Sequence, residues 1–358
     1  MAIDTNVEMR LARPEDLEEI GRQLPDVAGP FFPERFPGQT AADFCRWKYF
    51  TNPIGDAAVG VAVKGTRVIS VVAATPKRIQ VSSQSVLAFE LGDFITDRQH
   101  RKKGLFSGLI QLVCNEAAER GAGFVYVRPN EISFPILTKA LSFVEAQKVD
   151  ARRYVVPSGL IHRKVGLSPT VGRALGVDQI ARRLVLPAVN GSVNIQSLTR
   201  FAAEMDGFWD RVRGAYSFAL VRDFKYLNWR YVDCPTPYQL WIAHRGACTA
   251  GYVVCFVSPG ERIGHIVDLF TEPGDTEAAG ALLRIAMDAM LGHDVQSVHT
   301  WTLKTGAISA GTRLLRRACP LVYKPYLHVA MRFLDKSFTG GQLPSTGWQL
   351  AAGDFDGI

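Results

Sequence analysis

A short basic loop stands directly before a run of apolar residues with helical spacing. The loop ends in three adjacent cations and a glycine: Arg101, Lys102, Lys103 and Gly104. Apolar residues then recur every three to four positions, which predicts an amphipathic helix over 104–120. The first turn of a helix presents unpaired N–H groups, and Gly104 lets a ligand approach the backbone closely. The arrangement therefore predicts an anion site, for which phosphate is a typical ligand.

The elements that position this loop alternate between strands and helices. Apolar patterns predict strands at 7–13, 58–63, 67–75, 77–81, 86–96, 124–127, 143–149 and 152–156. Helical patterns begin at Pro14, beside two acidic residues, and cover 104–120 and 132–141. This order predicts an α/β fold with a mixed sheet, in which the basic loop follows the strand at 86–96.

The second half of the chain repeats features of the first half at a nearly constant offset. Trp47 and Trp229 are 182 residues apart, and so are Pro53 and Pro235. Ordered matches at one offset are typical of a duplicated domain. Because the tryptophans recur in both halves, we expect them to pack in the core rather than to bind a ligand. The predicted organisation is an N-terminal domain at 1–156, a helical connector at 157–200, a C-terminal domain at 201–336 and a tail at 337–358.

The basic loop carries a specific resemblance. Arg101-x-x-Gly104-x-Phe106 resembles the pyrophosphate-binding motif R/Q-x-x-G-x-G/A of the GNAT N-acetyltransferase superfamily, with Phe106 where Gly or Ala is usual. The resemblance extends over 5–150, since 7–16 looks like the family's first strand and helix, and Asn130 follows the next strand as the family's asparagine does. By this resemblance the chain is a tandem-domain GNAT member with a degenerate second GNAT-like half.

The resemblance implies that acetyl-CoA or another acyl-CoA binds at this loop as a cosubstrate. The N–H groups that would hold its pyrophosphate are those of Arg101, Lys102, Lys103, Gly104, Leu105, Phe106 and Ser107. The residues that would flank its pantetheine arm are Phe94, Ile95 and Thr96 on one side, and Asn130 and Ser133 on the other. The corresponding segment of the second half, 271–280, is acidic where CoA phosphates require cations, so we expect no CoA there.

Acyl transfer to an amine requires a proton acceptor for the amine. Glu90 lies eleven residues before Arg101, at an offset that resembles the base glutamate of some aminoglycoside-acetylating GNAT enzymes. The alternative role for Glu90 is a structural carboxylate paired with an arginine. Asp93 is the alternative base.

A proton donor for the leaving thiolate is harder to assign. The family's usual tyrosine is missing, because its position holds Leu137, followed by Thr138. Thr138 or Ser133 acting through water are candidates, as is a residue of the second domain or of the tail, where Asp354 and Asp356 are the acidic residues we considered.

The composition bounds the remaining possibilities. The chain has 358 residues, 47% of them hydrophobic, and a net charge of +7, which fits two ordinary globular domains. The histidines and cysteines show no metal-ligand spacing, so we expect no metal and mostly buried free thiols. No membrane span, signal peptide or basic stripe is recognisable, which predicts a cytoplasmic protein that binds neither membranes nor nucleic acid.

These features together predict an acyl-CoA-dependent N-acyltransferase, most simply an N-acetyltransferase, that acts by direct transfer on the amine of a small molecule. An amino sugar and an amino acid-like metabolite are the acceptor classes considered. Two alternatives remain open. One is a long-chain acyltransferase that uses an acyl-carrier protein, for which the apolar loop at 29–37 would suit a wider channel. The other is a CoA-binding scaffold without activity. The sequence leaves a homodimer open.

Overall fold

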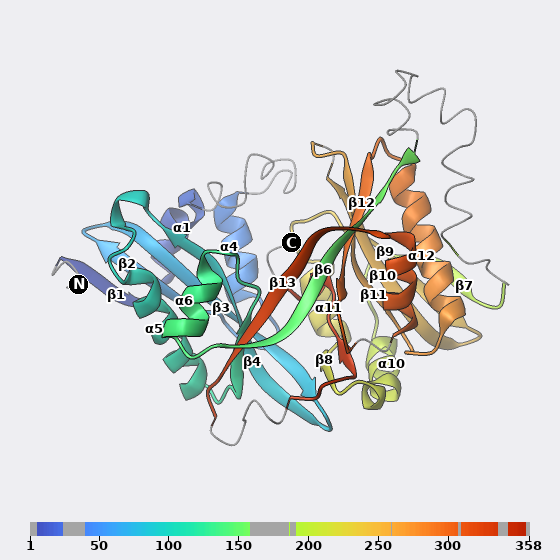
Figure 1. The fold of residues 1–358 in the computed structure, drawn as a ribbon, viewed down its shortest axis with the longest axis horizontal. Helices are drawn as coiled ribbons and strands as arrows, with labels where there is room; N and C mark the ends of the chain where they lie inside the picture. The colour runs from blue at the N-terminus through green and yellow to red at the C-terminus, as the bar shows by residue number, and fades with distance from the viewer. Residues whose placement is uncertain are drawn as a thin grey trace.

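One continuous mixed β-sheet runs through both halves of the chain (Figure 1). The structure, a computed structural model, describes residues 6–23, 40–157, 186, 191–258, 260–306, 309–335 and 343–355. The first half contains β1 (Val7–Leu11), α1 (Leu17–Gln23), α4 (Ala41–Phe50), β2 (Ala58–Lys64), β3 (Arg67–Val81), β4 (Gln84–Thr96), α5 (Leu105–Glu119), β5 (Phe124–Val127), α6 (Ser133–Ala140) and β6 (Val144–Val155). The second half contains β7 (Asn194–Leu198), α10 (Glu204–Val212), β8 (Phe218–Leu220), α11 (Phe224–Tyr231), β9 (Gln239–Arg245), β10 (Cys248–Ser258), β11 (Ile263–Thr271), α12 (Thr276–Leu291), β12 (Ser297–Leu303), α13 (Ala310–Ala318), β13 (Leu321–Phe333) and β14 (Trp348–Gln349).

The two halves exchange strands at the centre of the sheet. The strand order is β1-β2-β3-β4-β5-β13-β6-β12-β11-β10-β9-β7, so the last long strand of each half, β6 or β13, lies beside a strand of the other half, β12 or β5. Strand β13 pairs antiparallel with β5, and β6 pairs antiparallel with β12. In Figure 1 the long strands β13 and β6 cross the middle of the molecule side by side. Counted from the β7 edge, the strands β7-β9-β10-β11-β12-β6 correspond one by one to β1-β2-β3-β4-β5-β13 counted from the β1 edge. The halves are therefore two tandem domains of one topology.

The pseudo-twofold relation between the halves brings the repeated tryptophans together. The rings of Trp47 in α4 and Trp229 in α11 stack with centroids 5.1 Å apart. Each indole N–H donates to the backbone carbonyl of the other residue, at 2.9 Å from Trp47 and 3.3 Å from Trp229. Both side chains are buried. The prediction that these tryptophans pack in the core is confirmed.

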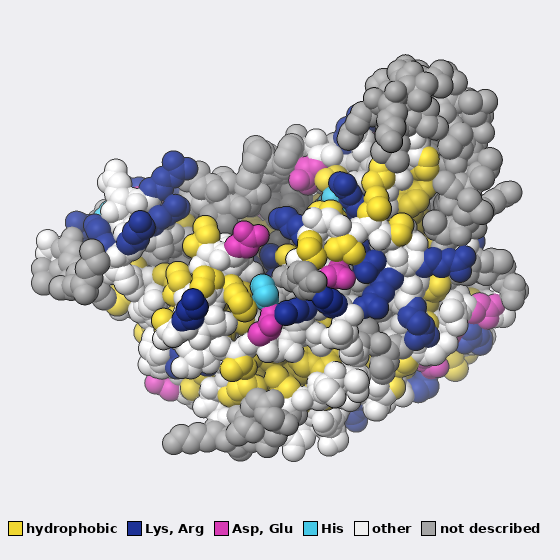
Figure 2. Space-filling model, in the orientation of Figure 1, with side chains coloured by type: hydrophobic (Ala, Val, Ile, Leu, Met, Phe, Trp, Pro, Cys, Tyr) yellow, Lys and Arg dark blue, Asp and Glu magenta, His cyan; other side chains and the backbone are white. Residues whose placement is uncertain are grey.

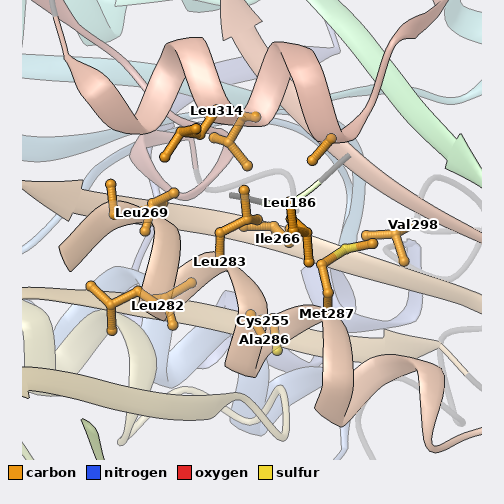
Figure 3. Packing of buried hydrophobic residues seen from close by; sticks show 14 of the residues in the cluster. Leu186, Cys255, Ile266, Leu269, Leu282, Leu283, Ala286, Met287, Val298 and Leu314 are labelled. Atoms are coloured by element: carbon orange, nitrogen blue, oxygen red, sulfur yellow. The ribbon is translucent and has the colours of Figure 1, made fainter. Parts of the chain in front are cut away.

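Each half covers its sheet with a long amphipathic helix. Helix α5 packs on β2, β3 and β4, and α12 packs on β9, β10 and β11. Figure 3 shows how α12 directs Leu282, Leu283 and Met287 toward the sheet, where Cys255 and Ile266 lie. All five are almost completely buried. Burial of one such leucine stabilises the fold by roughly 1.5–3 kcal/mol.

The predicted α/β class with a mixed sheet is confirmed, and the structure adds detail to the predicted elements in three places. The runs at 67–75 and 77–81 form one strand, β3, and those at 143–149 and 152–156 form β6. Helix α4 was not predicted, although Thr40 and Asp43 form a capping box at its start. The predicted helical connector lies largely outside the described residues, and its described end is the strand β7.

Candidate functional site

Strands β4 and β5 lie parallel for only four residues and then separate. Their paired residues run from Ala88 with Phe124 to Leu91 with Val127. Beyond this point β4 continues to Thr96, whereas β5 has ended. The edge of β4 from Gly92 onward therefore faces an opening, and its backbone groups on that side are not used by β5.

A β-bulge lies at the start of this opening. Between the pairs Ala73–Gly92 and Val71–Ile95, strand β3 has one residue and β4 has two, Asp93 and Phe94. Asp93 adopts a φ of +52°, in the left-handed region. A bulge bends its strand and re-aims the local side chains. Here it carries the Asp93 carboxylate to the wall of a pocket.

The predicted anion site lies at the start of α5. Gly104 is the N-cap residue, with φ +83°, and no side chain caps the helix. Lys102 is also in the left-handed region, with φ +62°. A Cβ added to Gly104 would meet no atom within 4 Å, so the backbone is open on that side. Free N–H groups and an open approach are what a diphosphate requires, so these residues fit the predicted ligand.

The other residues predicted to contact acyl-CoA lie around this opening in different ways. Ile95 and Leu105 direct their side chains into the core, which leaves only their backbone groups for a ligand. The ring of Phe106 packs edge-on against Phe94 at 5.1 Å. Arg101 donates from Nε to the Thr96 carbonyl at 3.0 Å, which ties the basic loop to the end of β4. The side chains of Lys103 and Ser107 are half-buried.

Asn130 and Ser133 shape the start of α6. The Asn130 Oδ1 atom accepts from the backbone N–H groups of Ile132 and Ser133, at 3.0 and 2.8 Å. Asn130 also lines the pocket described below, whereas Ser133 is buried in the helix cap. Thr138 donates its hydroxyl to the Phe134 carbonyl of its own helix at 2.9 Å and does not line that pocket. The structure thus brings Asn130 to the site and leaves Thr138 away from it.

A pocket of about 270 Å³ lies at the inner end of the opening. Its polar lining includes Lys48, Glu90, Asp93 and Arg128, and its apolar lining includes Phe355. The two predicted base candidates are therefore together in one pocket. Burial lowers the pKa of Arg128, and the Glu90 carboxylate opposes that effect.

Each pocket carboxylate has a buried lysine as its partner. Glu90 lies 3.5 Å from Lys77 Nζ, and Lys77 also donates to the Tyr226 hydroxyl at 3.0 Å. Asp93 lies 2.7 Å from Lys48 Nζ and accepts from the Tyr49 hydroxyl at 2.8 Å. The carboxylate of Glu90 is thus paired with a lysine, and Arg128 is a further cation that interacts with it in the same pocket.

The corresponding helix start in the second half is occupied by the protein itself. Asp275 caps α12 by accepting from the Ala278 N–H at 2.9 Å. Arg245 pairs with the same carboxylate at 2.9 Å. A backbone donor of the kind that stays open in α5 is thus satisfied by an acidic side chain in α12. The expectation that this half does not hold CoA phosphates stays a prediction.

The residues that the sequence analysis missed include Lys48, Arg128 and Phe355 in the pocket lining and Lys77, which pairs with Glu90. A signal for the first existed, because Trp47-Lys48-Tyr49 and Trp229-Arg230-Tyr231 place a cation between the same aromatics in both halves. Lys48 and Arg230 are both buried. No local pattern marked the others.

The surface around the site is mixed in charge. On the face seen in Figure 2, basic side chains lie in separate groups with acidic and apolar side chains between them. No helix in the described part of the chain is both long and apolar enough to cross a membrane. Among the same residues, no group of three or more His, Cys, Asp or Glu is arranged to hold a metal ion.

Comparison with known families identifies the first half. Residues 8–139 match the acetyltransferase (GNAT) domain. This part of the chain is therefore a GNAT domain, as the basic loop and the opening between β4 and β5 led us to expect. The comparison with curated proteins finds no match.

Solved structures extend the likeness to the whole chain. It is similar to a GCN5-related N-acetyltransferase from Anabaena variabilis, with a TM-score of 0.59, 12% identity, and coverage of 92% of this chain and 73% of that one. It is also similar to Saccharomyces cerevisiae N-myristoyltransferase with bound myristoyl-CoA, with a TM-score of 0.61, 12% identity, and coverage of 93% and 84%. At such identities the likeness establishes the fold, which is that of two tandem GNAT-like domains.

Proposed function

We propose that the protein is an N-acyltransferase that moves an acyl group from acyl-CoA to the amine of a small molecule. The observation that carries this proposal is the meeting of two features: the opening beside β4 and the uncapped start of α5 at Gly104. One suits an extended pantetheine arm and the other a diphosphate. The GNAT match over 8–139 supports the same donor. The myristoyl-CoA bound to the similar yeast N-myristoyltransferase supports a CoA ester as well.

The pocket supplies groups for direct transfer without a covalent enzyme intermediate. The attacking amine must lose a proton, and Glu90 and Asp93 are the carboxylates that line the pocket. In our proposal Glu90 accepts this proton, directly or through water, as the C–N bond forms and the C–S bond breaks. The Lys48 ammonium is buried beside the bulge and would stabilise the negative charge that develops on the thioester oxygen or sulfur.

The acceptor that we propose is a small amine, such as an amino sugar or an amino acid-like metabolite, and the site of action is the cytoplasm. Acetyl-CoA is the simplest donor. The pocket of about 270 Å³ is bounded on one side by Phe355, which suits a short acyl group.

The test of the donor site compares two glycines of the same helix. Gly104 precedes α5 with φ +83°, and Gly121 follows it with φ +82°, and neither would have a Cβ contact within 4 Å. We expect Gly104→Ala and Gly121→Ala to lose similar stability, about 1–2 kcal/mol, because both force a side chain into the left-handed region. Only Gly104→Ala should weaken CoA binding, by at least about tenfold, because its methyl group stands where the diphosphate approaches the backbone.

Isothermal titration calorimetry with CoA and acetyl-CoA measures this difference, and thermal unfolding measures the shared loss of stability. Equal affinity in the two variants would show that the start of α5 is not the diphosphate site. Absence of any CoA binding by the unmodified protein would remove the proposed function.

A further inference from the structure

The second half retains the groove that opens beside β4 in the first half. Residues 263–265 of β11 pair in parallel with residues 297–299 of β12. Beyond these residues the two strands separate, as β4 and β5 do. A bulge follows in β11, where Val267 is the extra residue before Asp268. Asp268 accepts from the Tyr231 hydroxyl at 3.1 Å, which repeats the contact between Asp93 and Tyr49.

This second groove is partly filled by residues 348–355, called here the 348–355 segment. The segment begins as β14, which pairs with β8, and continues through a 3₁₀ turn at Ala352–Asp354. Residues 349–351 lie against 266–269 of β11 and against Trp301 of β12. The space left between them is about 10 Å³, at the lower limit for a single water molecule. Nearer to the last paired residues of β11 and β12, a pocket of about 220 Å³ remains open beside Ala352. The first half holds a pocket of about 270 Å³ at the related place, where no such segment among the described residues lies along the strand beyond the bulge.

A buried ion pair anchors the segment. Arg222 Nη2 donates to both oxygens of the Asp354 carboxylate, at 2.8 and 3.0 Å. Arg222 Nε donates to the Tyr252 hydroxyl at 3.1 Å and lies 3.5 Å from Asp268. Arg230 supplies a second buried cation and donates to the carbonyl groups of residues 353 and 355, both at 3.1 Å. Two arginines thus balance two aspartates, which a buried cluster of this kind requires.

The last residue of the anchored segment, Phe355, forms part of the wall of the pocket that Glu90 and Asp93 line. The Phe355 ring lines the pocket and packs on Tyr126 and Trp301, with centroids 6.0 and 5.8 Å away. The Tyr126 hydroxyl donates to the Asp354 carbonyl at 3.2 Å. The segment has little freedom to shift, because a Cβ on Gly353 would lie only 2.1 Å from the Tyr231 hydroxyl.

We propose that the 348–355 segment occupies the part of the second groove where the pantetheine arm of acyl-CoA would lie in the first half, and that its anchor to Arg222 holds Phe355 as the wall that limits acyl chain length in the first half. Phe355 is then the residue that determines donor specificity, and Arg222 is a positioning residue that acts through Asp354. This inference rests on the proposed function, because it requires the acyl group to enter the pocket that Phe355 bounds.

The test compares the affinities of acetyl-CoA and octanoyl-CoA by isothermal titration calorimetry. We expect Phe355→Ala to raise the preference for octanoyl-CoA over acetyl-CoA by at least about tenfold, because each further buried methylene is worth roughly a fourfold change in affinity. Phe355→Leu opens less space and should give a smaller change of the same sign, which keeps the test available if the alanine variant folds poorly.

Asp354→Asn tests the anchor, because it removes the charge and keeps the shape of the side chain. We expect it to shift the preference in the same direction as Phe355→Ala. The matched control is Asp275→Asn, which removes a carboxylate paired with Arg245 in the same half but outside the pocket lining. The control should leave the preference unchanged.

Three results would overturn the inference in distinguishable ways. An unchanged preference in both Phe355 variants, with both esters bound, would show that Phe355 does not limit the acyl group. An unchanged preference in Asp354→Asn alone would remove the positioning role of the anchor. If the unmodified protein bound neither ester, the proposed function would be wrong and the inference with it.

Discussion

The two carboxylates that line the pocket, Glu90 and Asp93, differ in their surroundings. Asp93 is held by both Lys48 and the Tyr49 hydroxyl, at 2.7 and 2.8 Å. Glu90 has its lysine at the longer distance of 3.5 Å. We take Glu90 as the proposed base, because its contact with Lys77 is longer than that of Asp93 with Lys48.

Glu90→Gln and Asp93→Asn separate these roles. If Glu90 is the base, Glu90→Gln should lower kcat/KM by about 10²–10⁴-fold and leave the CoA affinity within twofold. Thiol release from acetyl-CoA across a panel of amines measures turnover, and calorimetry measures binding. Unchanged turnover in Glu90→Gln, with a loss in Asp93→Asn, would transfer the role to Asp93. Tight CoA binding with no turnover on any amine, even by the unmodified protein, would favour a scaffold.

His299 gives the fold a defined dependence on pH. Burial and then the nearby Arg153 lower the pKa of His299 to about 4, well below its ordinary value near 6.5. The unfolded chain therefore binds this proton at a higher pH than the folded chain does. The stability linked to His299 is complete above pH 6.5 and is lost as the pH falls toward 4. In His299→Gln the free energy of unfolding, measured in urea from pH 4 to 7, should depend less steeply on pH. An identical slope in the two proteins would contradict this.

At the scale of elements, sequence patterns located features formed by neighbouring residues and missed contacts between residues far apart in the chain. The helix start at Gly104 was predictable, because cations, a glycine and apolar spacing are adjacent in the chain. The opening beside β4 followed only from resemblance, since no residue pattern tells where two strands stop pairing. The Glu90 partner was not predictable, because Lys77 meets it across a strand pair and is fixed by Tyr226, 149 residues away. The same holds for Arg222 and Asp354, which are 132 residues apart.

The strand exchange was hidden for a related reason. Strands β6 and β13 have ordinary strand patterns, and nothing in either pattern selects its neighbour in the sheet. The repeat at an offset of 182 residues predicted two similar halves, which the related strand orders show. A sequence repeat predicts which elements each half contains. It does not predict that a strand of one half joins the sheet of the other.

At the scale of the whole molecule, the halves share structure that neither could form alone. Strand β13 completes the sheet of the first half, and β6 completes that of the second. The two tryptophans at the pseudo-twofold axis donate hydrogen bonds to each other's backbone. The 348–355 segment packs in the second half and ends in the pocket of the first. Loss of order in one half therefore removes core contacts from the other.

This coupling predicts one cooperative unfolding transition for a chain of 358 residues, a length at which separate domains commonly unfold in separate steps. Differential scanning calorimetry should give a single peak whose calorimetric and van't Hoff enthalpies agree. Trp229→Phe, which removes one indole hydrogen bond at the axis, should lower Tm without splitting the peak, by a destabilisation of about 1–2 kcal/mol. Two resolved peaks in the unmodified protein would mean that the exchanged strands do not couple the halves, and each would then have to hold its own sheet together without the strand of the other.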